Sequence, residues 1–389
     1  MSDPTPDRIL AEESDNPWVK LILWAHEDPV RPAYRWNGVM KYLVEERLDT
    51  DSAASKRALP LSGEELEHVK NFFPNDTDFK KDQHDITIEN HIFSENLSFI
   101  GAIFAQPIIF RNCRFKRSVK FYGANFEVGA IFSGSEFSET VDFGDAQFRF
   151  AALFERVTFC GQINFYWLEN ESNLLAIFRK AIFIKKTPRF HGQKFHPGCM
   201  FHGVTWPKIP KRNGDKKTQD AIENALLDQI TSYEFIRTQA EHIGQLELRK
   251  EMIRRELACR AELAEPSFER LLRKAYGWIC DHGTSIGRPA FALLCIWGFT
   301  FLAWRGWAAQ EAAVTTWDVF YHTGRRMLPF VGGHAYVEEH TLKALRAAPH
   351  VLHFLSAMAA ILSPFLLFLM ALGLRFKFRM LVWRYSAAI

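Results

Sequence analysis

Residues 123–148 read GANFEVGAIFSGSEFSETVDFGDAQF, with a phenylalanine at every fifth or sixth position. They belong to a longer series in which a large apolar residue returns after alternating gaps of five and six residues between Ile88 and Phe165. Helices and strands repeat their side-chain directions about every 3.6 and 2 residues, so neither keeps this phase. A fixed short repeat over many units is typical of a solenoid, whose coils bury a continuous axis of stacked side chains.

A second position repeats in the same phase, two residues before most of the large ones. Compact residues occupy it: Ala102, Cys113, Val119, Ala124, Ala130, Ser135, Val141, Ala146, Ala152 and Val157. Four short faces make one square coil with one large inward residue per face, and the neighbouring slot must hold a small residue because the adjacent wall is close. The expected inward ladder is Phe99, Phe104, Phe110, Phe115, Phe121, Phe126, Phe132, Phe137, Phe143, Phe148, Phe154, Phe159 and Phe165.

These two positions resemble those of the pentapeptide-repeat family in its Phe-rich form. In that family a bulky centre residue and a small residue two places before it point into a narrow right-handed β-helix. The resemblance implies a right-handed quadrilateral β-helix over residues 86–207, with an insertion near 166–176. The expected fold class is therefore mixed: this solenoid flanked by helices, plus a C-terminal two-helix transmembrane domain.

The ladder is interrupted after Phe165 and again after Phe183, and the prolines that follow Trp206 end it. Residues 1–16 read as a disordered tail. Residues 17–85 predict a helical N-terminal cap, because an exposed β-helix end invites aggregation. Residues 208–288 predict a basic linker and an amphipathic helical arm, bent at Gly244. Its charge-rich part leaves two alternatives open, an oligomeric coiled-coil contact or a solvated helix packed on the solenoid.

A membrane domain is expected at residues 289–374, because two apolar segments, about 289–309 and 351–374, are long enough to cross a bilayer core of about 30 Å. The first reaches that length only if Arg305 snorkels to the interface. The tail 375–389 carries four bases and no acid, whereas the loop between the segments carries four of each. The positive-inside rule then places both termini in the cytosol. Together with the family resemblance, this implies a multi-pass protein of a bacterial inner (cytoplasmic) membrane. The N-terminus has no signal-peptide core, in agreement with this orientation.

The charge balance of the chain limits the classes of partner that we expect it to bind. The 48 Lys and Arg residues nearly balance the 45 Asp and Glu residues, so no nucleic-acid partner is expected. Residues 166–217 are locally basic, with eleven bases against three acids, as expected near anionic lipid headgroups. Mimicry of DNA needs acidic faces, and the near-neutral repeat with eight acids and seven bases disfavours it.

Catalytic and metal-binding signatures are weak. His191, His196, Cys199 and His202 have zinc-ligand chemistry, but the phase of the repeat places the histidines outward on different faces and the cysteine inward. The sequence contains no P-loop, HExxH or nucleophile-elbow motif, so we expect no enzyme activity, no cofactor and no metal. The six cysteines form no CxxC pair and read as reduced and structural.

The loop between the two apolar segments gives the sharpest functional hypothesis. A short helix is expected at 315–321, followed by an apolar, flexible turn that is a candidate pore loop: Met327, Leu328, Pro329, Phe330, Val331, Gly332 and Gly333. This C-terminal region resembles the membrane portion often attached to bacterial pentapeptide repeats, which is distantly channel-like. It departs from potassium channels in lacking a TVGYG filter, and Arg325 and Arg326 would repel cations.

The leading functional prediction is a membrane-anchored scaffold whose cytosolic solenoid binds or senses a protein partner. The expected partners are the lipid bilayer, an unidentified protein on the solenoid, and further copies of the chain in a homo-oligomer. The alternative is an oligomeric, ion-channel-like pore gated by the cytosolic domain.

Overall fold

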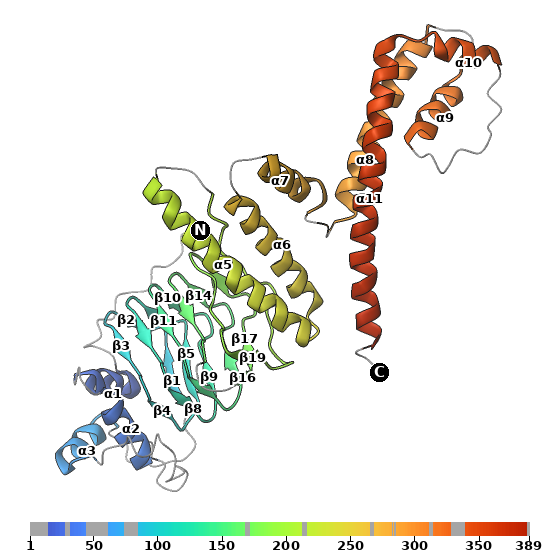
Figure 1. The fold of residues 1–389 in the computed structure, drawn as a ribbon. Helices are drawn as coiled ribbons and strands as arrows, with labels where there is room; N and C mark the ends of the chain where they lie inside the picture. The colour runs from blue at the N-terminus through green and yellow to red at the C-terminus, as the bar shows by residue number, and fades with distance from the viewer. Residues whose placement is uncertain are drawn as a thin grey trace. The chain divides into compact units, whose positions relative to one another are not determined.

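The computed structural model describes residues 15–27, 32–43, 61–73, 85–167, 172–211, 216–264, 268–281, 283, 285–310, 314–327 and 339–386. The chain divides into two units, Met1–Cys259 and Arg260–Ile389. Figure 1 shows the strands of the first unit and the long helices of the second.

The first unit is a parallel β-solenoid of very short strands (Figure 1). Its strands are β1 (Ile86–Glu89), β2 (Ile92–Phe93), β3 (Leu97–Ser98), β4 (Ile103–Phe104), β5 (Ile108–Arg111), β6 (Arg114–Phe115), β7 (Val119–Lys120), β8 (Asn125–Phe126), β9 (Ala130–Ile131), β10 (Glu136–Phe137), β11 (Val141–Asp142), β12 (Gln147–Phe148), β13 (Ala152–Leu153), β14 (Thr158–Phe159), β15 (Ile163–Asn164), β16 (Ser172–Leu174), β17 (Ala176–Ile177), β18 (Ile182–Phe183) and β19 (Gln193–Phe195). Every fourth strand joins the same sheet, as in the order β1-β5-β9-β13-β17. This confirms the four-faced solenoid, while its right-handed sense stays a prediction.

The solenoid core is a set of stacked phenylalanine rings. Phe132 lies between Phe110 and Phe154, with ring centroids 5.6 and 5.2 Å apart and nearly parallel planes. Phe115 and Phe137 come as close as 4.6 Å. Every expected ladder residue is buried apart from Phe148, which is half-buried. These buried rings therefore form the core of the solenoid.

The compact slots are buried as well, and the polar ones among them are bonded to the backbone. The Ser135 hydroxyl donates to the Phe110 carbonyl at 2.9 Å and accepts from the Cys113 amide at 3.0 Å. The Cys113 thiol donates to the Ile88 carbonyl at 3.3 Å. A polar residue fits this slot because the previous coil supplies its partner.

Extra residues cause the two interruptions of the ladder. They are inserted between positions whose rings still stack on the rings of the previous coil, so these columns of rings continue. A regular coil has 22 residues, as from Phe110 to Phe132 (132 − 110). The stack from Phe154 reaches Phe178 after 24 residues (178 − 154) and remains at 5.0 Å. In the described residues one column does break: β12 ends its sheet, and β16 pairs only with β19.

Three helices lie at the N-terminal end of the solenoid: α1 (Pro17–His26), α2 (Pro32–Leu43) and α3 (Gly63–Lys70). The Trp36 indole donates to the Ile103 carbonyl at 3.0 Å. The Asn37 amide bonds both the Gly101 carbonyl and the Ile103 amide, at 3.0 and 2.8 Å. These bonds occupy backbone groups that would otherwise face solvent at the first coil.

The C-terminal end is covered by α5 (Lys216–His242) and α6 (Leu246–Leu263). Arg189 of the last coil pairs with Asp228 of α5 at 2.7 Å, and Trp206 meets the buried Tyr233 edge to face. The two helices separate at Gly244, whose φ of +72° favours glycine. Helix α5 thus packs on the solenoid, and Arg255 of α6 donates to the Pro207 carbonyl at 3.1 Å. The coiled-coil alternative for the charge-rich part stays a prediction.

The second unit is helical, with α7 (Phe268–Cys280), α8 (Gly287–Ala308), α9 (Thr316–Met327), α10 (Glu339–Arg346) and α11 (His350–Ser386). Helices α8 and α11 are long and apolar enough to cross a membrane. Only 11% and 28% of their apolar windows are buried, which is low for the core helix of a soluble protein. The expected tail 375–389 continues α11 as far as Ser386.

We predict that Phe132→Ala destabilises the solenoid by about 3–5 kcal/mol, because it opens a cavity between two stacked rings. The matched control is Phe150→Ala, whose side chain is 56% exposed in the same solenoid. Chemical unfolding of the full-length protein in detergent, followed by circular dichroism, gives both free energies. Equal losses from the two substitutions would contradict the ladder as the source of stability.

Candidate functional site

The residue before each centre residue points outward, and its chemistry differs between the four faces. On the face made by β3, β7, β11 and β15, these residues are Ser98, Lys120, Asp142 and Asn164. This face is polar, as expected of a solvated surface.

The face made by β1, β5, β9, β13 and β17 is different. Four of its outward residues are aliphatic and pair in register on successive coils. An isolated β-bridge pairs the last of them with a methionine on the next coil. We call this set the apolar column: Ile109, Ile131, Leu153, Ile177 and Met200. Ile109 is 8% exposed and Met200 is 42% exposed, and the three residues between them are half-buried.

Charged pairs border one side of the apolar column. Arg111 pairs with Glu89, and Arg179 lies 3.5 Å from Glu155, each pair joining two coils. Exposed pairs of this kind contribute little to stability, roughly 0–1 kcal/mol each. An apolar centre with a charged rim has the anatomy of a protein–protein interface. Sequence reasoning missed this site, although its signal is present once every fourth repeat is compared.

The structure does not bring the candidate zinc ligands together. The His191 ring stacks on Phe235 of α5, with centroids 5.9 Å apart, whereas His196 accepts a hydrogen bond from the Gly198 amide. The Cys199 thiol points inward and donates to the Leu174 carbonyl at 2.9 Å. Among the described residues, no group of three or more His, Cys, Asp or Glu side chains converges as metal ligands would.

None of the six cysteines forms a disulfide. Four are buried, Cys160 is half-buried and Cys295 is exposed. Burial raises the pKa of the Cys113 thiol to about 12 and that of Cys199 to about 11. Both therefore remain protonated and unreactive at neutral pH.

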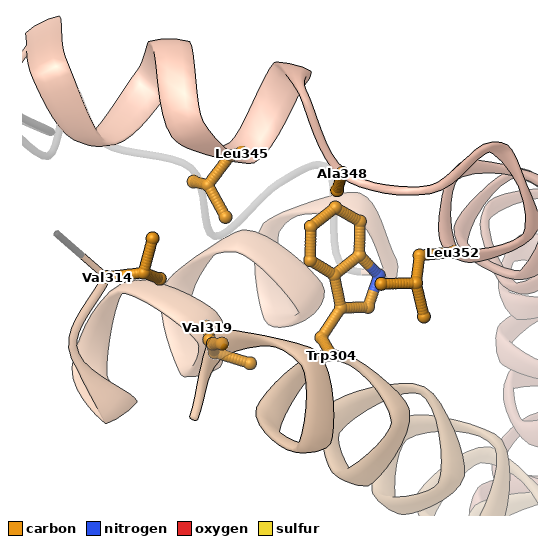
Figure 2. Packing of buried hydrophobic residues seen from close by; sticks show 7 residues of the cluster. Trp304, Val314, Val319, Leu345, Ala348 and Leu352 are labelled. Atoms are coloured by element: carbon orange, nitrogen blue, oxygen red, sulfur yellow. The ribbon is translucent and has the colours of Figure 1, made fainter. Parts of the chain in front are cut away.

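In the second unit, residues of α8, α9, α10 and α11 meet in one buried cluster around Trp304 (Figure 2). The Trp304 indole donates to the Ser356 hydroxyl at 2.8 Å and lies against the rings of His322 and His353, at 4.6 and 5.5 Å. Helix α9 begins with a side-chain cap, in which the Asp318 amide donates to the Thr315 hydroxyl and the Asp318 carboxylate accepts from the Thr315 amide. This cluster packs α9 against both long helices.

Helix α9 is longer than the sequence predicts. It continues past Tyr321 to Met327, which is buried at its last position rather than beginning a flexible turn. The other residues of the candidate pore loop, Leu328, Pro329, Phe330, Val331, Gly332 and Gly333, lie outside the described part of the chain.

His322 is the perturbed titratable group of this cluster. Burial, and then the charges of Arg326, His353 and Arg325, lower its pKa to about 4. Among the described residues, its Nε2 atom has no hydrogen-bond partner. The imidazole is therefore neutral at pH 7.

Comparison with known proteins supports the assignment of the solenoid. A family model described as "Pentapeptide repeats (9 copies)" matches residues 91–136. No curated protein sequence and no solved structure gives a significant match. The matched residues carry the first part of the ladder and its compact slots, so this segment is similar to pentapeptide repeats. The proposed channel-like resemblance of the C-terminal region gains no support from these comparisons.

We predict that the packing of α9 weakens as the pH falls from about 6.5 toward 4. The lowered pKa means that the unfolded state binds the His322 proton more tightly, so the stability held above pH 6.5 is lost on acidification. Hydrogen exchange of α9 amides in the full-length protein, corrected for intrinsic rates, should rise several-fold between pH 7 and pH 5.

His322→Phe should abolish this pH dependence, because it removes the titrating group and keeps a ring beside Trp304. The control is His202→Phe, at an exposed position of the solenoid. A pH response of α9 that survives His322→Phe would show that another group controls it.

Proposed function

We propose that the protein is a membrane-anchored scaffold whose solenoid binds a protein partner through the apolar column. Helices α8 and α11 anchor it in the inner (cytoplasmic) membrane, with both termini in the cytosol. The observation that carries this proposal is the apolar column, which has no role in the solenoid's own core.

The anchor is supported by the surfaces of the two long helices. Large apolar side chains are exposed along both: Phe291, Leu294, Phe299, Leu302, Val351, Phe354, Ile361, Phe365 and Phe368. In water this much exposed apolar surface on two helices would drive aggregation. In lipid it is favourable, and a helix bonds its own backbone there.

Binding rather than catalysis is supported by the solenoid itself. Solenoids of this class are generally structural or interaction folds, and most of the side chains that the repeat singles out here are used to fill the core. A rigid rod presents its outward residues in fixed register, which suits recognition of an extended partner surface.

We predict that the double substitution Ile131→Glu and Leu153→Glu abolishes partner binding without unfolding the solenoid. Full burial of an aliphatic side chain contributes roughly 1.5–3 kcal/mol, so binding should fall at least tenfold. Both side chains point outward and the ring stack is untouched. Ile182→Glu on a neighbouring face is the matched control, since Ile182 is also outward and exposed.

Two measurements on the full-length protein in detergent check this prediction. Affinity capture from cells, using a photocrosslinker at position 177, detects a different protein as partner. Native mass measurement detects a second copy of the chain. If the double variant keeps the same captured protein and the same mass as the parent, the apolar column is not the binding surface.

The alternative function, a gated pore, remains a prediction that rests on α9, which lies between the two long helices in the sequence and packs against both. Planar-bilayer recordings of the purified full-length protein test it. Under this alternative we expect unitary conductance steps that change when Met327→Glu adds a charge at the end of α9. Silent bilayers at concentrations where the protein is oligomeric would remove the pore hypothesis.

A further inference from the structure

Helix α7, directly before the first long helix, has two different faces. Ile279 and Cys280 pack with Leu366 and Leu369 of α11. On another face Phe268, Leu271 and Trp278 are 73%, 64% and 82% exposed, at helical spacing. A helix with an exposed apolar stripe beside basic residues is typical of a membrane interface, where indole rings also accumulate.

An apolar groove of about 680 Å³ runs between α7 and α8. Trp278 and Ile279 form its α7 wall. Its α8 wall includes Phe291, Ala292 and Cys295, and the lining positions on α8 repeat every four residues. The groove therefore follows one face of α8 for about 14 Å from its N-terminal end.

Arg288 is the charged residue in the lining of this groove, and it lies in the first turn of α8. Its side chain is 54% exposed, and it forms an ion pair with Asp281, whose carboxylate lies 3.8 Å from the Nη1 atom, beyond hydrogen-bond distance. The guanidinium group thus keeps donors available at the mouth of the groove. An arginine can bind a phosphate with two parallel hydrogen bonds.

We propose that this groove is a binding site for an anionic phospholipid, with one acyl chain between α7 and α8 and the headgroup phosphate on Arg288. This inference rests on the proposed membrane anchor, since it requires the N-terminal end of α8 to lie at the headgroup level. The groove is continuous with the exposed apolar surface of α8 at Phe291, so bilayer lipid reaches it by lateral diffusion.

A lipid suits the groove better than a peptide would. The lining is apolar except at one end, and that end carries a positive charge. A phospholipid has the same polarity, with one charged end and a featureless apolar chain. A peptide would bring backbone amide groups into the apolar part, where few polar partners could satisfy them.

The test uses the full-length protein in phosphatidylcholine vesicles that contain a trace of a photoactivatable lipid with a diazirine on its acyl chain. The probe is phosphatidylglycerol in one set and phosphatidylcholine in the other. We expect adducts on the groove-lining segments of α7 and α8 to be up to about fivefold more abundant with phosphatidylglycerol, from the attraction of one base near the headgroup.

Two pairs of variants locate the site. Arg288→Gln should reduce the phosphatidylglycerol adducts to the phosphatidylcholine level, whereas Arg305→Gln, at the other end of the same helix, should not. Gly287→Phe should block the groove, because a side chain there meets open space. Gly298→Phe, equally unobstructed but not in the lining, is its control.

The outcomes separate this inference from the proposed anchor. Equal labelling by both lipids in the parent protein, or a preference that survives Arg288→Gln, would overturn the lipid site alone. If neither lipid labels α8 or α11 anywhere, the membrane anchor is wrong and the lipid site falls with it.

Discussion

The ring-on-ring contact of the phenylalanines is the constraint on which the first unit depends. Parallel strands in a sheet lie about 4.7–4.9 Å apart, and stacked aromatic rings are favourable at a similar separation. Ring spacings from 4.6 to 5.6 Å satisfy both at once. Because each ring must lie over the one before it, extra residues are confined to places between the ring columns, as after Phe165. The outward positions carry no such requirement.

That difference explains what the sequence alone could reveal. Inward positions are constrained only by the size of the side chain. The ladder, the compact slots and the end of the repeat near Trp206 could therefore be predicted directly from the sequence. Long apolar runs likewise revealed the helices around Pro289 and Val351. The apolar column was not readable in the same way, because Ile131 and Leu153 become neighbours only once the coil length is known. The packing of α5 depended on individual contacts such as Arg189 with Asp228, which no periodicity encodes.

The covered ends of the solenoid limit where a partner can bind. Trp36 and Asn37 occupy backbone groups of the first coil, and Tyr233 covers the last rings. Open ends would offer unpaired strands to any other chain, and these helices occupy them. Recognition is then left to the side faces, where chemistry varies from polar at Lys120 to apolar at Leu153. In the second unit, the cluster around Trp304 fixes α9 in a comparable way, by burying a ring that touches two other helices.

Each coil rises by one strand spacing, so the residues in the row from Ile109 to Met200 are evenly spaced along the solenoid. An α-helix laid along it would present a turn every 5.4 Å against residues about 4.8 Å apart, and over the four intervals of this row the two spacings would differ by about 2.4 Å. A helical ligand can therefore match only part of this row. A partner whose strands have the same rise can match every residue of the row.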